Sequence, residues 1–160
     1  MKGNRDLSQR IRPVDQEELR DMPIATSAFH WRESYSVNIE ELDQHRQKLF
    51  TVISEFNDGL SSGKGHVATY VVLQQLSEFA QTYFAKEEAL MTKHCFLGLI
   101  THRAEHHEFT EKLAKFKREF RNGKSDVPVQ LLLYLQSWLR DHILASDKAW
   151  GGYLNARGVK

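Results

Sequence analysis

The stretch LDQHRQKLFTVISEFNDGL, residues 42–60, carries the pattern that decides the fold of this chain. Its apolar residues recur three, four or seven positions apart, at Leu42, Leu49, Ile53, Phe56 and Leu60. Because an α-helix has about 3.6 residues per turn, this spacing places them along one side of a helix. The sequence SSGKG at residues 61–65 then interrupts the pattern. We therefore predict an amphipathic helix over about residues 41–60.

Three further helices are predicted downstream of this first one. The apolar pattern continues without a breaker from His66 to about His94, which predicts the second helix. Gly98 marks a turn, and the third helix closes at Asn122-Gly123, a typical helix end. The fourth runs from about Asp126 to about residue 149. Long helices with short connections and no strand-like alternation predict an all-α fold, an up-down four-helix bundle.

The composition narrows the partners that we expect. Lys and Arg number 22 against 21 Asp and Glu, and no long basic run occurs, so we expect neither nucleic acid nor a membrane surface as partner. The longest apolar stretches, such as LLLYL at 131–135, fall far short of the roughly 20 residues that cross a bilayer. The single cysteine, Cys95, cannot form an internal disulfide. These features, with no secretory signal, predict a cytoplasmic protein.

The first residues differ in composition from the rest of the chain. Residues 1–28 are rich in charge and hold two of the three prolines, Pro13 and Pro23. We interpret them as an N-terminal arm that precedes one domain at residues 29–160. The arm is a candidate contact for a partner protein.

Polar residues on the apolar sides of these helices are candidates for a metal site, because bundles hold metals between facing helices. His102 and His106 lie four positions apart, so both imidazoles project from one side of the third helix. His142 and Asp147 of the fourth helix and Glu87 of the second lie among bulky apolar residues. Burying such groups costs several kcal/mol unless a partner neutralises them.

Three imidazoles and two carboxylates suit iron, manganese or zinc, and the absence of a thiolate argues against a structural zinc of the finger type. Two interpretations without metal stay open at this point. The five residues could form a buried hydrogen-bonded network. The pair His102 and His106 alone could also belong to a polar helix surface that is rich in histidine.

Several separated motifs resemble the bacterial hemerythrins, over about residues 31–160. They are WRESYSVNIEELD, YFAKEEALM, HRAEHHEF, WLRDHILASDKAW and YLNARGV. The resemblance implies a four-helix bundle with non-haem iron that binds dioxygen or another small diatomic ligand. In that family two irons are bridged by a glutamate, an aspartate and a small oxygen species. The resemblance implies that His102, His106 and His142 bind one iron, and that Glu87 and Asp147 are the bridging carboxylates.

The second iron position departs from the family pattern at two residues. Tyr83 stands where the family has a histidine, four residues before the bridging glutamate. In the first helix the family register places Arg46 at the other histidine position, and His45 comes one residue early. Adjacent helix residues point about 100° apart, so His45 would need a local irregularity such as a π-bulge to serve as a ligand. We expect instead that Arg46 offsets the carboxylate charge and that one iron is bound, with two as the alternative.

These departures predict an iron protein that binds or senses oxygen or another small ligand, with a degenerate second metal position and no enzymatic role. Three alternatives stay open. Tyr83 as a phenolate could ligate a diiron or dimanganese site that handles oxygen or peroxide. His45 could complete an ordinary site for reversible oxygen binding and storage. A bundle held by one metal or by Arg46 could be purely structural.

Overall fold

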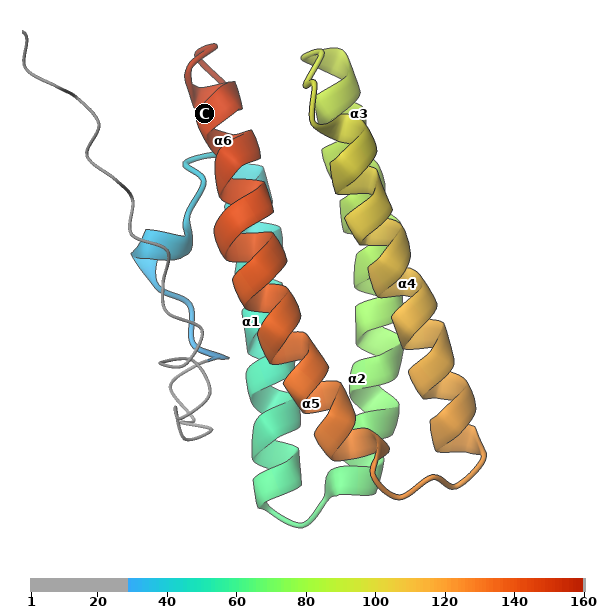
Figure 1. Cartoon of the computed structure of the whole chain (residues 1–160). Helices are drawn as coiled ribbons and strands as arrows, with labels where there is room; N and C mark the ends of the chain where they lie inside the picture. The colour runs from blue at the N-terminus through green and yellow to red at the C-terminus, as the bar shows by residue number, and fades with distance from the viewer. Residues whose placement is uncertain (1–28, 160) are drawn as a thin grey trace, which may run out of the picture.

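A computed structural model describes residues 29–159, which fold into an all-α four-helix bundle (Figure 1). The first helix is α1 (Glu40–Ser61), preceded by a short 3-10 turn, η2 (Glu33–Tyr35). The second consists of α2 (Gly65–Phe79), a π-helical segment η3 (Ala80–Phe84) and α3 (Ala85–Lys93). The third is α4 (Leu99–Arg121). The fourth consists of α5 (Val127–Trp138), a π-helical segment η4 (Leu139–Ser146) and α6 (Asp147–Asn155).

The all-α bundle predicted from the periodicity is confirmed, and two details differ. The fourth helix continues to Asn155 instead of ending near residue 149, because Trp150 and Leu154 extend its buried side. In the connection between α3 and α4, the residue with a positive φ is Cys95, at 53°. Gly98, where the sequence predicted the turn, has a φ of −80°. The predicted arm at residues 1–28, with its expected partner contact, lies outside the described residues.

The bundle interior is packed with large apolar side chains along its length. Each fully buried aliphatic or aromatic residue contributes about 1.5–3 kcal/mol relative to its exposed state. The bulkiest apolar residues with less than 2% exposure include Leu42, Leu49, Ile53, Leu76, Phe109, Leu131 and Trp150.

None of the described helices has the length and apolar character needed to cross a bilayer.

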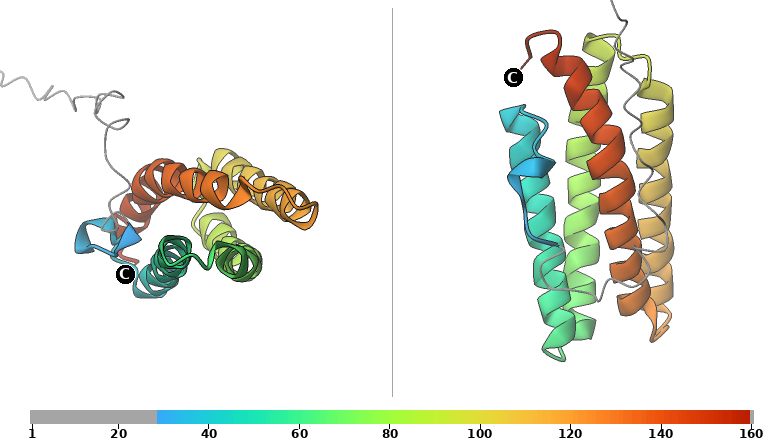
Figure 2. Two further views of the ribbon diagram at one scale, coloured as in Figure 1. Left: turned by 90° about the horizontal axis from the view of Figure 1, so that it is seen from below. Right: turned by 60° about the vertical axis from the view of Figure 1, so that its left-hand side comes forward.

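The segment before α1 is fixed against the first and last helices, as Figure 2 shows. Ser36 Oγ donates a hydrogen bond of 2.6 Å to Asp43 Oδ2, and the Val37 amide donates one of 2.8 Å to Asp43 Oδ1. From α6, Asn155 Nδ2 donates to the Val37 carbonyl at 2.7 Å. These bonds hold the chain that leads into α1 close to the end of the bundle that carries α6.

Gly151 allows α6 to approach this segment closely. A Cβ at position 151 would lie 2.5 Å from Val37 Cβ and 3.3 Å from Val37 Cα, whereas a Cβ at Gly152 would meet nothing within 4 Å. We expect Gly151→Ala to lower the free energy of unfolding by about 1–3 kcal/mol. The matched variant Gly152→Ala should raise it by up to about 1 kcal/mol, because alanine favours the helix. Chemical denaturation measures both, and equal effects would contradict the packing argument.

Candidate metal centre

Five polar side chains meet inside the bundle, where the surrounding residues are apolar. They come from three helices, and each is at most 3% exposed: Glu87, His102, His106, His142 and Asp147. One possible ligand atom from each of Glu87 and the three histidines lies within 4.8 Å of the others. The interpretation of His102 and His106 as a polar helix surface is therefore wrong, because both imidazoles are buried.

The donor atoms of these residues face a common volume. Glu87 Oε2 lies 3.3 Å from both His102 Nε2 and His106 Nε2. Asp147 Oδ1 lies 3.2 Å from His142 Nε2 and 3.4 Å from His102 Nε2. Three imidazole nitrogens and one Glu87 oxygen are thus gathered around one point, and Asp147 Oδ1 approaches this group from the side of His102 and His142.

Several of these atoms lack a hydrogen-bond partner within the described residues. His106 Nε2, His142 Nε2 and Asp147 Oδ1 are fully buried and unpartnered, since their mutual contacts are not aligned as hydrogen bonds. Buried polar atoms are normally paired. A cation between Glu87 and the three imidazoles would satisfy the two histidine nitrogens, so the residues fit a metal ion of the iron, manganese or zinc type.

Two further carboxylates contact the outer nitrogens of the histidines. Glu88 Oε1 lies 2.9 Å from His106 Nδ1, and Glu105 Oε2 lies 2.6 Å from His142 Nδ1. In the tautomer that carries its proton on Nδ1, each imidazole donates to its carboxylate and directs the Nε2 lone pair at the centre. The sequence analysis missed both residues. Glu88 follows Glu87 directly and Glu105 precedes His106 directly, so the sequence placed both near the candidate site. Which histidine each carboxylate contacts depends on how the helices pack against each other.

The π-helical segments bring distant positions onto the same side of a helix. In a regular α-helix His142 and Asp147, five residues apart, would point about 140° away from each other. In η4 the hydrogen bonds connect residues five apart, so both side chains reach the centre. The other π-helical segment, η3, lies next to the centre as well. It contains Tyr83 and ends three residues before Glu87. Apolar spacing alone did not predict either segment.

Arg46 points into the bundle and is 0% exposed. Its Nη2 and Nε donate to Asp147 Oδ2 at 2.8 and 3.1 Å. The carbonyls of Tyr35 and Ile143 each accept another of its hydrogen bonds at 3.0 Å. Asp147 therefore binds the guanidinium through Oδ2 and presents Oδ1 to the histidines.

His45 and Tyr83 lie next to each other but at different depths. His45 is half-buried, and its Nδ1 is 2.6 Å from the Glu41 carbonyl of its own helix. The helix α1 is regular there, so the π-bulge that would redirect His45 does not occur. Tyr83 is fully buried, stacks on His45 at 5.5 Å between ring centroids, and donates to Glu87 Oε1 at 3.3 Å.

Burial and neighbouring charges shift the pKa values of three groups around this point, which are Tyr83, Glu87 and Asp147. It raises the pKa of Tyr83 well above the usual value, and the charge of Glu87 adds to that effect. Burial also raises the pKa of Asp147, again reinforced by Glu87. For Glu87 itself, burial acts in the same direction, but the close contacts with the imidazoles of His102 and His106 outweigh it and hold the pKa of Glu87 below the normal range.

Comparison with known proteins agrees with this geometry. Residues 37–154 match the family model of the hemerythrin HHE cation binding domain. A bacteriohemerythrin of Clostridium acetobutylicum is 25% identical over 127 residues, covering 76% of this chain and 98% of the relative. A bacteriohemerythrin of Pseudomonas aeruginosa is 27% identical over 126 residues, 79% of each protein. A hemerythrin-like protein of Naegleria gruberi is 28% identical over 128 residues, 80% of this chain and 95% of the relative.

Proposed function

Because this chain belongs to the hemerythrin HHE cation-binding family, we propose that it binds a single non-haem iron ion and uses it to bind or sense a small diatomic ligand. His102, His106 and His142 hold the ion in this proposal. Glu87 and Asp147 add carboxylate oxygens. The role is binding rather than enzymatic catalysis.

The observation that carries the single-ion proposal is the contact between Arg46 and Asp147. The guanidinium already neutralises Asp147 through Oδ2, at 2.8 Å from Nη2. A second divalent cation beside Asp147 would be repelled by this permanent positive charge and would compete for the same oxygen. Arg46 therefore takes the electrostatic place of the second metal that the family uses.

The surrounding residues orient the histidines and keep water away from them. Phe84 stacks on His106 at 3.7 Å between ring centroids, and Trp138 stacks on His142 at 4.6 Å. Tyr83 orients Glu87 through its hydroxyl. Iron held by these residues would supply the redox and ligand-binding chemistry that dioxygen or nitric oxide requires.

Metal analysis together with an optical spectrum tests this proposal. We expect about one iron per chain after anaerobic loading, because one cluster of unpartnered donors is available. We also expect no repeated, reversible spectral change when oxygen is added and removed. Two irons per chain with reversible oxygenation would contradict the single-ion site.

A second candidate function follows from the position of Tyr83 beside Glu87. As a phenolate, Tyr83 could ligate a diiron or dimanganese site that handles oxygen or peroxide. The hydroxyl hydrogen bond to Glu87 and the raised pKa favour a neutral tyrosine instead. A phenolate charge-transfer band in the loaded protein, absent after Tyr83→Phe, would support this second candidate. The contact of His45 with its own helix gives no support to a site that uses His45.

A further inference from the structure

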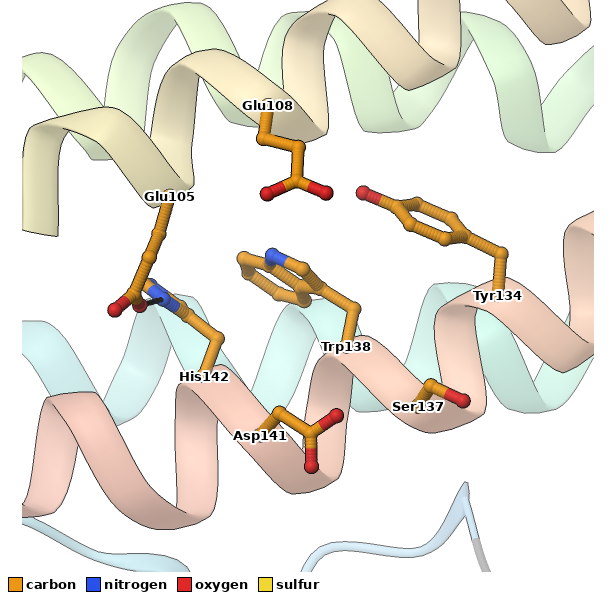
Figure 3. Close-up of a pocket in the computed structure, with 7 residues that line it drawn as sticks. All are labelled: Glu105, Glu108, Tyr134, Ser137, Trp138, Asp141 and His142. Carbon is orange, nitrogen blue, oxygen red and sulfur yellow. Dashed lines mark hydrogen bonds and ion pairs between the residues drawn. The ribbon is translucent and has the colours of Figure 1, made fainter.

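The metal centre is enclosed, and a cavity next to it reaches one of its histidines. All five residues of the centre are at most 3% exposed, so an ion needs a route through the protein. A cavity of about 430 Å³ lies between α4 and the α5–η4 helix, with His142 in its wall (Figure 3). This cavity is a candidate for the route.

The lining of the cavity is strongly acidic. It contains the carboxylates of Glu105, Glu108 and Asp141 and, among the described residues, no lysine or arginine. Asp141 already binds its neighbour Arg140 at 2.7 and 2.9 Å, and Glu105 contacts His142. Glu108 has neither a hydrogen bond nor an ion pair with the described residues, and its carboxylate faces Trp138 and Tyr134 (Figure 3). Glu108 is thus the carboxylate that is free to bind an incoming cation.

Trp138 places an unpartnered polar atom at the cavity, independently of the carboxylates. The residue is only 8% exposed, and its indole Nε1 is buried without a hydrogen-bond partner among residues 29–159. In Figure 3 this nitrogen is on the side of the ring that faces Glu108. A buried N–H group normally finds an acceptor, and an oxygen atom of a molecule bound in the cavity would supply one. Water brought in by a hydrated ion is such an oxygen.

The cavity lies against the outer side of the centre, at His142. Glu105 is about one-third exposed, lines the cavity, and contacts His142 Nδ1 at 2.6 Å. Its other oxygen accepts a hydrogen bond from Ser146 at 3.0 Å. A cation held between Glu108 and Glu105 would therefore lie next to the ring of a proposed ligand.

We propose that this acidic cavity is the entry site for hydrated divalent metal ions on their way to the centre, with Glu108 as the capturing carboxylate. The inference rests on the proposed function, since it takes His142 as a metal ligand. Carboxylates that line a concave site concentrate cations and raise their rate of association.

Loading of metal-free protein with Co²⁺ tests the entry site, followed in a stopped-flow instrument by the visible absorption of the bound ion. We expect Glu108→Gln to slow loading about 3- to 10-fold without changing the final metal content. Glu108→Asp, which keeps the charge, should retain most of the rate. Higher ionic strength should slow the wild type more than Glu108→Gln.

The matched control is Glu55→Gln, which removes the same charge from an exposed position on α1. Its loading rate should stay within about a factor of two of the wild type, because distant surface charges are screened. Equal slowing by both variants, or normal loading by Glu108→Gln, would overturn the entry site and leave the metal centre intact. Failure of the wild type to bind either Co²⁺ or Fe²⁺ would instead overturn the proposed function and the entry site together.

Discussion

Arg46→Ala is expected to lower the free energy of unfolding by about 3–5 kcal/mol, the usual cost of removing one member of a buried ion pair. The change leaves the Asp147 carboxylate, which is 0% exposed, without its guanidinium. It also leaves the carbonyls of Tyr35 and Ile143 without the donors that they now have. Denaturant unfolding of the metal-free protein measures the effect without interference from metal binding.

The neighbouring variant His45→Ala is the control for Arg46→Ala. His45 is half-buried, and its ring nitrogen contacts only the backbone of its own helix among the interactions described. We expect its removal to cost less than about 1 kcal/mol. Similar losses of stability in the two variants would show that Arg46 is not an essential buried partner of Asp147.

His106→Ala is expected to reduce bound iron from about one ion per chain to a small fraction of that amount. The change removes a ligand atom, Nε2, that lies 3.3 Å from Glu87 Oε2 and has no hydrogen-bond partner in the part of the chain that the structure describes. Losing one of few ligands weakens a buried site strongly, because the remaining ligands cannot complete the coordination. Metal analysis after gel filtration gives the stoichiometry.

The control for this experiment is His107→Ala, one position further along α4. His107 is exposed, so its imidazole is directed away from the centre. Iron content in this variant should equal that of the wild type, and the melting temperature should still rise when iron is added. Unchanged iron content in His106→Ala would remove His106 from the proposed ligand set.

The sequence by itself determined the bundle and indicated five of the polar residues inside it, which are Glu87, His102, His106, His142 and Asp147. The spacing of Leu42, Leu49 and Ile53 follows the helical period, which depends only on local backbone geometry. Likewise, His102 and His106 share one side of α4 because four residues make about one turn. Both inferences use neighbours in the chain, so no knowledge of the other helices was needed. The periodicity did not, however, reveal that α6 extends the fourth helix to Asn155.

Only the tertiary structure decided between His45 and Arg46. The apolar side of α1 passes between the two positions, so either side chain could have turned inward. Arg46 is inside because its partners are there, and two of them, Ile143 and Asp147, are 97 and 101 residues away in the chain. The same holds for Glu88 and Glu105, whose contacts with His106 and His142 cross between helices.

The π-helical segments are another feature that only the tertiary structure decided. Whether His142 and Asp147 face one point depends on a shift of backbone hydrogen bonds within η4. That shift costs helix stability locally and is offset by the packing and pairing of side chains from other helices. Local periodicity therefore fixes which segments are helical. The direction of a side chain at the edge of the apolar face is fixed by contacts with residues far away in the sequence.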